Sequence, residues 1–209
     1  MARPVTLFTA QWTDLPIKTM CEKAHAWGFD GLELATWGDH LDLTKATSDP
    51  SYGEQHKALL KQHDLGCWSV GCHIIGQCVG DAPDPRLDVF APDKLAGKPK
   101  EIRRWAIDEM MKTPAAAKAM GVDVVTGFMG SPIWKYLYSF PPTSEEMIED
   151  GFGEIVELWG PIFDEFDRQG VRFALEVHPG EIAFDLYTMQ RLINAFNSRK
   201  TIGVNFDPS

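Results

Sequence analysis

The sequence predicts an α/β protein of the (β/α)8 TIM barrel class, with about six of the eight strand-helix units in this chain. Short β-rich runs alternate with helical segments along the whole sequence, which is typical of a parallel sheet with right-handed crossovers. The connections after strands are long (74–100 and 127–144) and those after helices are short, as expected for a barrel with its active site in the loops after the strands. Residues 8–12 contain no glycine, which argues against the phosphate loop of a doubly wound sheet.

Six strands are expected where apolar and β-branched residues form short runs bounded by turn residues. Their predicted ranges are 5–9, 32–35, 67–73, 122–126, 171–176 and 202–206. Five helices are expected in the intervening segments, the first because its apolar residues recur at spacings of three and four. Their predicted ranges are 15–27, 51–63, 102–120, 145–169 and 185–197.

Several residues predict where helices begin, end or bend. Asp14 is expected to cap the first helix and Gly28 to end it, and Asp185 is a candidate cap for the last helix. Pro114 falls inside the third predicted helix and is expected to kink or split it, because proline lacks the backbone N–H. A break is also expected near Pro161 in the fourth helix.

Composition limits the class of protein. The 209 residues are enough for one domain with a sizeable core, so a single domain over 1–209 is expected. The net charge of -10 and the lack of a Lys/Arg cluster argue against nucleic-acid binding. Four cysteines without a CxxC pair favour a reduced, cytoplasmic protein over a disulfide framework or a structural zinc site. No apolar run of about 18 residues is present, so no membrane span is expected.

Residues 172–185 (RFALEVHPGEIAFD) form the most informative stretch. It begins as an alternating strand and ends on a carboxylate, a histidine, a Pro-Gly turn and a second carboxylate. Similar polar or aromatic residues follow the other strands, and in a barrel all of these ends meet on one face. The candidates are Gln11, Glu33, Trp37, His40, His73, Gln77, Glu176, His178, Glu181 and Asp207.

Glu176 and Asp207 end neighbouring predicted strands, which lie about 4.8 Å apart in a sheet. Two carboxylates at matching heights could share one ion, and their hard oxygens suit a divalent cation such as Mg²⁺ or Mn²⁺. The alternatives are a core carboxylate paired with an arginine for Glu176 and a helix cap for Asp207.

Five other residues are predicted to bind substrate: His73, His178, Glu181, Trp37 and His40. His178 could instead hold Glu176 in place, Glu181 could be a solvated loop carboxylate, and His73 could be a core histidine. Trp37, with Trp134 and Tyr138, could stack on a sugar ring or simply form the core of a loop.

The sequence resembles the sugar phosphate isomerase/epimerase group of the xylose isomerase-like TIM barrels, over essentially the whole chain. The matching segments are WGFDGLELATWGDH, CWSVGCHIIGQ, GVDVVTGFMGS, GVRFALEVHPGEIAFD and IGVNFDPS. The resemblance implies a divalent metal (Mn, Mg, Co or Zn) held by Glu, Asp, His and Glu at the ends of strands five to eight. Glu176 and Asp207 match the first two ligands. It also implies that Glu176 is a catalytic base that removes the proton next to a carbonyl, giving a metal-stabilised enediolate.

The resemblance further implies that strands seven and eight would follow Ser209, so this chain is expected to be the N-terminal part of a longer protein. Six strands leave an open sheet edge and an exposed core, which predicts instability or pairing with another chain, such as a homo-oligomer.

The expected function is therefore a metal-dependent sugar isomerase or epimerase with a small carbohydrate substrate. A keto-sugar or keto-inositol dehydratase or eliminase of the same fold is the alternative, because it begins with the same proton abstraction. A repair endonuclease would need more metal ligands and a basic groove. A non-catalytic sugar-binding subunit is the fourth class.

Overall fold

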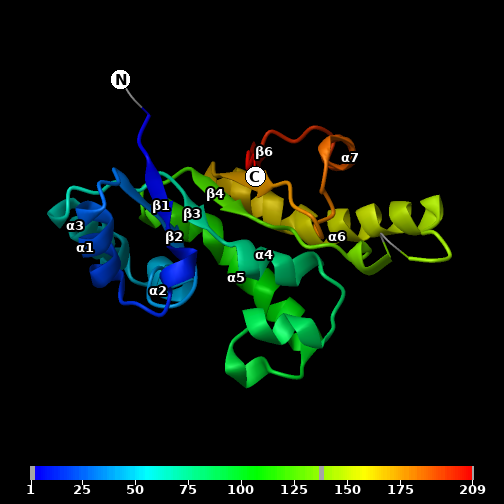
Figure 1. The fold of residues 1–209 in the computed structure, drawn as a ribbon, viewed down its shortest axis with the longest axis horizontal. Helices are drawn as coiled ribbons and strands as arrows, with labels where there is room; N and C mark the ends of the chain where they lie inside the picture. Colours follow the sequence, from blue (N-terminus) through cyan, green and yellow to red (C-terminus); the bar gives the residue numbers. More distant parts are fainter. Residues whose placement is uncertain (1–2, 137–138, 209) are drawn as a thin grey trace. The chain divides into compact units, whose positions relative to one another are not determined.

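The computed structural model describes residues 3–136 and 139–208 and alternates strands with helices, from β1 in blue to β6 in red (Figure 1). The strands are β1 (Thr6–Phe8), β2 (Gly31–Ala35), β3 (Val70–Gly71), β4 (Val124–Gly127), β5 (Arg172–Glu176) and β6 (Ile202–Asn205). The α-helices are α1 (Ile17–Ala26), α2 (Leu43–Ser48), α3 (Pro50–Gln62), α4 (His73–Gly80), α5 (Pro99–Ala119), α6 (Glu145–Gln169) and α7 (Leu186–Ala195). Short 3-10 helices are η1 (Thr9–Trp12), η2 (Pro85–Phe90), η3 (Asp93–Leu95) and η4 (Trp134–Tyr136).

The six strands form a sheet in the order of the chain, β1-β2-β3-β4-β5-β6. The pairs β1–β2, β2–β3, β3–β4 and β5–β6 are all parallel, which confirms the predicted fold class with six strand-helix units. No helix in the described ranges is long and apolar enough to cross a membrane.

The chain divides into two compact units. Unit 1 consists of residues 1–72, 112–126 and 169–171, and unit 2 consists of 73–111, 127–168 and 172–209. Unit 1 holds β1 to β3 and most of β4. Its core includes the fully buried Met20, Cys21 and Ala24 of α1, and Leu32 and Leu34 of β2.

Unit 2 is built on β5, β6 and α6. The aromatic rings of Trp159 and Phe163 on α6 lie 5.1 and 5.7 Å from the ring of Phe173 on β5, and all three side chains are fully buried. Burial of such rings stabilises a fold by about 3 kcal/mol each. This packing fixes β5, and the parallel register with β6 then places Glu176 opposite Asn205.

One predicted helix cap is wrong and one is confirmed. The first helix begins at Ile17, so its cap position is Pro16, and Asp14 lies too far upstream. The Ile17 N–H donates instead to Asp39 Oδ2 at 3.2 Å. Asp185 does cap α7: its carboxylate accepts from the backbone N–H of Thr188 at 2.8 Å in a capping box.

Neither proline divides its helix, so the predicted splits at Pro114 and near Pro161 are wrong. Helix α5 continues through Pro114, and α6 continues through Pro161. A proline removes one hydrogen bond from a helix, and tertiary packing can hold the helix despite that loss. The neighbours of Pro114 provide such packing, because Thr113, Ala116 and Ala117 are fully buried.

The third predicted strand and the loop after it also differ from the structure. Strand β3 has only two residues, and His73 is the first residue of α4, where a structureless segment was expected from residue 74. Gly76 and Gly80 allow this helix to lie directly against the backbone after β4. An added Cβ would lie 2.0 Å from Phe128 O and 2.1 Å from Met129 O, so only glycine lets α4 pack directly on that backbone.

Candidate active site

Glu176 lies at the C-terminal end of β5, with its side chain 16% exposed. Its Oε2 accepts a hydrogen bond from Asn205 Nδ2 at 2.9 Å and lies 3.3 Å from His73 Nε2. Both contacts use the same carboxylate oxygen. Oε1 is therefore the oxygen that can accept a proton or bind a cation.

His73 and Phe128 connect Glu176 to the loops after the strands. The imidazole of His73 is buried at the start of α4, and its ring meets the edge of the Phe128 ring at 4.8 Å. The Phe128 ring also lies 5.1 Å from the ring of His178. His73 is therefore buried and contacts the candidate base, and substrate binding by His73 stays a prediction.

His178 and Asp207 take different positions from Glu176. The His178 side chain is exposed, and its Nδ1 lies 2.7 Å from Pro179 O. In the described part of the chain, His73 and Asn205 hold the Glu176 carboxylate, rather than His178. Asp207 follows the end of β6 by two residues and is exposed. The register places Asn205, not Asp207, opposite Glu176, and a ligand role for Asp207 stays a prediction.

Glu181 is 2% exposed, so it is not the solvated loop carboxylate that the sequence allowed. Its Oε2 accepts hydrogen bonds from the backbone N–H groups of Met129 (3.0 Å) and Gly130 (2.7 Å). Burial raises the pKa of Glu181 to about 8, and repulsion from Asp81 acts in the same direction. The two backbone N–H groups and a hydrogen bond with Gln77 oppose this rise.

A second buried carboxylate, Asp81, lies close to Glu181. Its Oδ1 accepts from Ser131 N–H and from Gln77 Nε2, both at 2.8 Å. Burial raises the pKa of Asp81 as well. Together Glu181 and Asp81 bind three consecutive backbone N–H groups, those of residues 129–131, and so hold the loop after β4 against the segments that follow α4 and β5.

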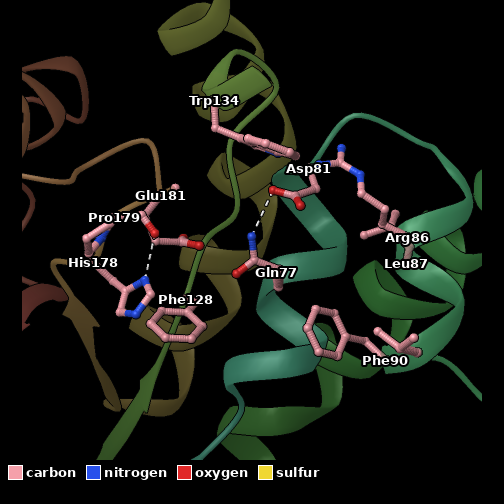
Figure 2. Close-up of a pocket in the computed structure, with 12 residues that line it drawn as sticks. Gln77, Asp81, Arg86, Leu87, Phe90, Phe128, Trp134, His178, Pro179 and Glu181 are labelled. Carbon is pink, nitrogen blue, oxygen red and sulfur yellow. Dashed lines mark hydrogen bonds between the residues drawn. The ribbon is translucent and has the colours of Figure 1, made fainter. Parts of the chain in front are cut away.

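These side chains line a pocket of about 430 Å³ in unit 2, shown in Figure 2. Gln77 lies between Asp81 and Glu181 in this view, with the Trp134 ring on one side of the pocket and the Phe128 ring on the other. The pocket walls do not include Glu176 or His73. Phe128 joins the two regions, because it lines the pocket and also contacts His73.

Trp37 and His40 belong to unit 1. The half-buried Trp37 ring packs edge-on against Phe8, with ring centroids 6.0 Å apart. His40 is fully buried, and its ring nitrogens lie 2.8 Å from Thr9 Oγ1 and 3.0 Å from Leu15 O. Burial lowers the pKa of His40, which favours the neutral ring. These contacts are those of a packing histidine, and substrate binding by either residue stays a prediction.

Two further candidates from the sequence have different outcomes. Glu33 on β2 is held inside unit 1, where its carboxylate accepts hydrogen bonds from Thr126 Oγ1 at 2.7 Å and from Ser69 Oγ. Tyr138 lies outside the described residues.

Sequence reasoning missed Asn205 and Asp81. The motif NFDPS contains Asn205, but only the β5–β6 register shows that it faces Glu176.

The buried proton of Glu181 predicts a pH-dependent stability. The folded pKa of about 8 lies above the ordinary value of 4.5, so between these values the folded state keeps a proton that the unfolded state has released. The free energy of unfolding should therefore fall as the pH rises through this window, by at most about 1.4 kcal/mol per pH unit. The free energy of unfolding, measured with urea at several pH values in this window, should fall less steeply with pH in Glu181→Gln than in wild type. The exposed Glu157→Gln serves as control, and an unchanged slope in Glu181→Gln would contradict the assignment.

The candidate residues include the types of donor atom that divalent metal ions bind. Carboxylate oxygens of Glu176 and Asp207 suit Mg²⁺ or Mn²⁺, and the imidazole of His73 suits Zn²⁺. Among the described residues, no group of three His, Cys, Asp or Glu side chains could hold a metal ion. Catalytic zinc sites typically have three protein ligands, and metal binding by Glu176 and Asp207 therefore stays a prediction.

Comparisons with known proteins identify one family to which this chain belongs. A family model described as xylose isomerase-like TIM barrel matches residues 21–209. No curated protein matches the chain.

Three solved structures share the fold. The 3-keto-D-glucoside 4-epimerase YcjR from E. coli has a TM-score of 0.64 and 14% identity, over 97% of this chain and 67% of that one. The probable 3-DHS dehydratase AsbF from Bacillus anthracis has a TM-score of 0.61 and 16% identity, over 97% and 62%. A xylose isomerase-like TIM barrel protein from Mycobacterium smegmatis, solved with magnesium, has a TM-score of 0.59 and 13% identity, over 98% and 64%. The chain thus spans about two thirds of the length of each.

Proposed function

Because this chain belongs to the xylose isomerase-like TIM barrel family, we propose that it is a sugar isomerase or epimerase in which Glu176 removes the proton next to a carbonyl. The observation that carries this proposal is the carboxylate of Glu176 at the end of β5, held through one oxygen by Asn205 and His73. A base in this arrangement is pre-oriented, which is what general base catalysis requires.

The two contacts give each neighbour of Glu176 a role. The Asn205 amide donates to Oε2, which fixes the plane of the carboxylate and turns Oε1 toward the substrate. His73 Nε2 lies 3.3 Å from Oε2 as well, so the imidazole can donate a hydrogen bond to this oxygen while the carboxylate is ionised. After proton transfer to Oε1, return of the proton to the neighbouring carbon gives isomerisation. Epimerisation requires a second acid, on the opposite face of the enediolate, to deliver a proton to the same carbon.

A divalent metal bound by Glu176 and Asp207 would polarise the substrate carbonyl and lower the cost of forming the enediolate. The magnesium in the Mycobacterium smegmatis structure supports this proposal, as does the oxygen-rich donor set of this chain. The ion is proposed to be Mn, Mg, Co or Zn.

A dehydratase or eliminase acting on a keto-sugar or keto-inositol is the second candidate. It would begin with the same removal of the proton next to the carbonyl by Glu176, followed by loss of a hydroxyl group as water. The probable dehydratase from Bacillus anthracis supports it as a chemistry that this fold can carry.

Product analysis separates the two candidates. The protein, loaded with each metal in turn, would be incubated with a panel of ketoses and 3-keto-glycosides, and the products would be identified by NMR. A stereoisomer or aldose product is expected for the isomerase or epimerase. An unsaturated product with loss of water would identify the dehydratase. Absence of both products with every metal would contradict the proposal.

A further inference from the structure

We propose that the pocket between Phe128 and Trp134 binds an uncharged ring that carries hydroxyl groups, so that the substrate has a second ring beside the one that reacts. The link to the reacting ring rests on the proposed function, because it uses Phe128, which lines this pocket and contacts His73 beside Glu176. Binding to the pocket itself can be measured without any reaction.

The pocket has the size and walls of a small-molecule site. Its volume of about 430 Å³ falls within the usual range for such sites, about 300–1,000 Å³. The rings of Phe128 and Phe90 and the side chain of Leu87 give it apolar surface. Trp134 is held in place by the guanidinium group of Arg86, which stacks 3.8 Å from the indole ring. Apolar and aromatic walls of this kind suit the carbon face of a sugar ring.

The charges around the pocket disfavour a phosphate. Proteins bind phosphates with free backbone N–H groups and arginines. Here the three backbone N–H groups of residues 129–131 are already bound by Glu181 and Asp81. The guanidinium of Arg86 is paired with Asp84, with Nε 2.9 Å from Oδ1. A phosphate would therefore meet two buried carboxyl groups, three backbone N–H groups that are already bound and an arginine whose charge is balanced by Asp84.

The polar groups that remain suit hydroxyls, which both donate and accept hydrogen bonds. The Gln77 amide lies on the pocket wall, where Nε2 donates to Asp81 and the amide also bonds with Glu181. His178 must carry its proton on Nδ1, because Nδ1 lies 2.7 Å from the carbonyl oxygen of Pro179. Nε2 is the other polar atom of the His178 ring, which lines the pocket. The buried carboxyl of Glu181 adds a donor whenever it is protonated.

Calorimetry and saturation-transfer NMR with two probes test this proposal. The probes are methyl β-D-glucopyranoside, an uncharged ring, and D-glucose 6-phosphate. Both would be measured on wild type, Gln77→Leu and Trp134→Leu, with Gln190→Leu on the exposed face of α7 as the matched control. Two pocket variants are used so that a folding defect in one does not remove the test, and unfolding curves would verify that each is folded.

The glucoside is expected to bind wild type and Gln190→Leu alike, and to bind each pocket variant about tenfold more weakly because a hydrogen bond or a ring contact is lost. The 6-phosphate is expected to bind wild type about tenfold more weakly than the glucoside. Equal or tighter binding of the phosphate, unchanged affinity in both pocket variants, or no binding of the glucoside would each overturn the proposal.

Glu176→Gln distinguishes a failure of this inference from a failure of the proposed function. If the pocket is assigned correctly, this variant binds the glucoside as wild type does, whether or not Glu176 is the catalytic base. If wild type converts a ketose but does not bind the glucoside, the reaction stands and the second-ring assignment is wrong.

Discussion

Replacing Glu176 with Gln is expected to lower kcat for proton exchange by about a thousandfold, while the fold stays intact. The amide has nearly the shape of the carboxylate and can still accept from Asn205 Nδ2, now 2.9 Å from Oε2. It cannot accept a proton from carbon at neutral pH, so the loss should appear in kcat rather than in stability. Steady-state kinetics and urea unfolding of the same preparation measure both quantities.

The matched control is Glu157→Gln, which makes the same chemical change at an exposed position of α6 that is not part of the candidate site. It should leave kcat unchanged. If Glu176→Gln keeps wild-type kcat, Glu176 is not the base, whatever its position at the end of β5.

Replacing Gly76 with Ala is expected to destabilise the protein by about 3 kcal/mol. The added Cβ would lie 2.0 Å from the carbonyl oxygen of Phe128 and 3.4 Å from the Trp159 ring, so either α4 or the backbone after β4 must move. Because α4 begins with His73 and carries Gln77, activity and glucoside binding should fall together with stability. The free energy of unfolding would be measured in urea.

Gly153→Ala on α6 is the control, because nothing lies within 4 Å of its added Cβ. Alanine is the better helix former, so this variant should be more stable than wild type by about 0.5–1 kcal/mol. If Gly76→Ala lowers the free energy of unfolding and Gly153→Ala raises it, the destabilisation comes from the close approach of α4 and not from the loss of a glycine as such. Equal effects at the two positions would contradict this.

The parts of the fold that depend on local sequence were predicted well. Helix α6 begins at Glu145 and ends at Gln169, as predicted, and Asp185 caps α7 because its partner Thr188 is only three residues away. The end of β5 at Glu176 was also predicted, since the alternation of apolar residues stops there.

What the sequence could not predict depends on contacts between distant segments. Asn205 contacts Glu176 only because of the β5–β6 register, which two separate strand predictions do not fix. Helix α4 packs against the backbone of Phe128, more than fifty positions along the chain, and Gly76 makes this close approach possible. Pro114 does not break α5, because burial of its surroundings outweighs the local preference.

Glu181 illustrates the same limit at the candidate site. The sequence identified it as a polar residue after β5 but could not show that it is buried against Met129 and Gly130, or that Asp81 lies beside it. Its environment, and hence its raised pKa, is a property of three loops that meet only in the folded protein.

Deuterium exchange tests the role of Glu176 most directly. The metal-loaded protein would be incubated with its substrate in heavy water, and the recovered substrate would be examined by NMR at the carbon next to the carbonyl. If Glu176 Oε1 removes that proton, wild type should introduce deuterium at that single carbon, and Glu176→Gln should introduce none above the uncatalysed rate. Equal incorporation of deuterium by both proteins would contradict the account.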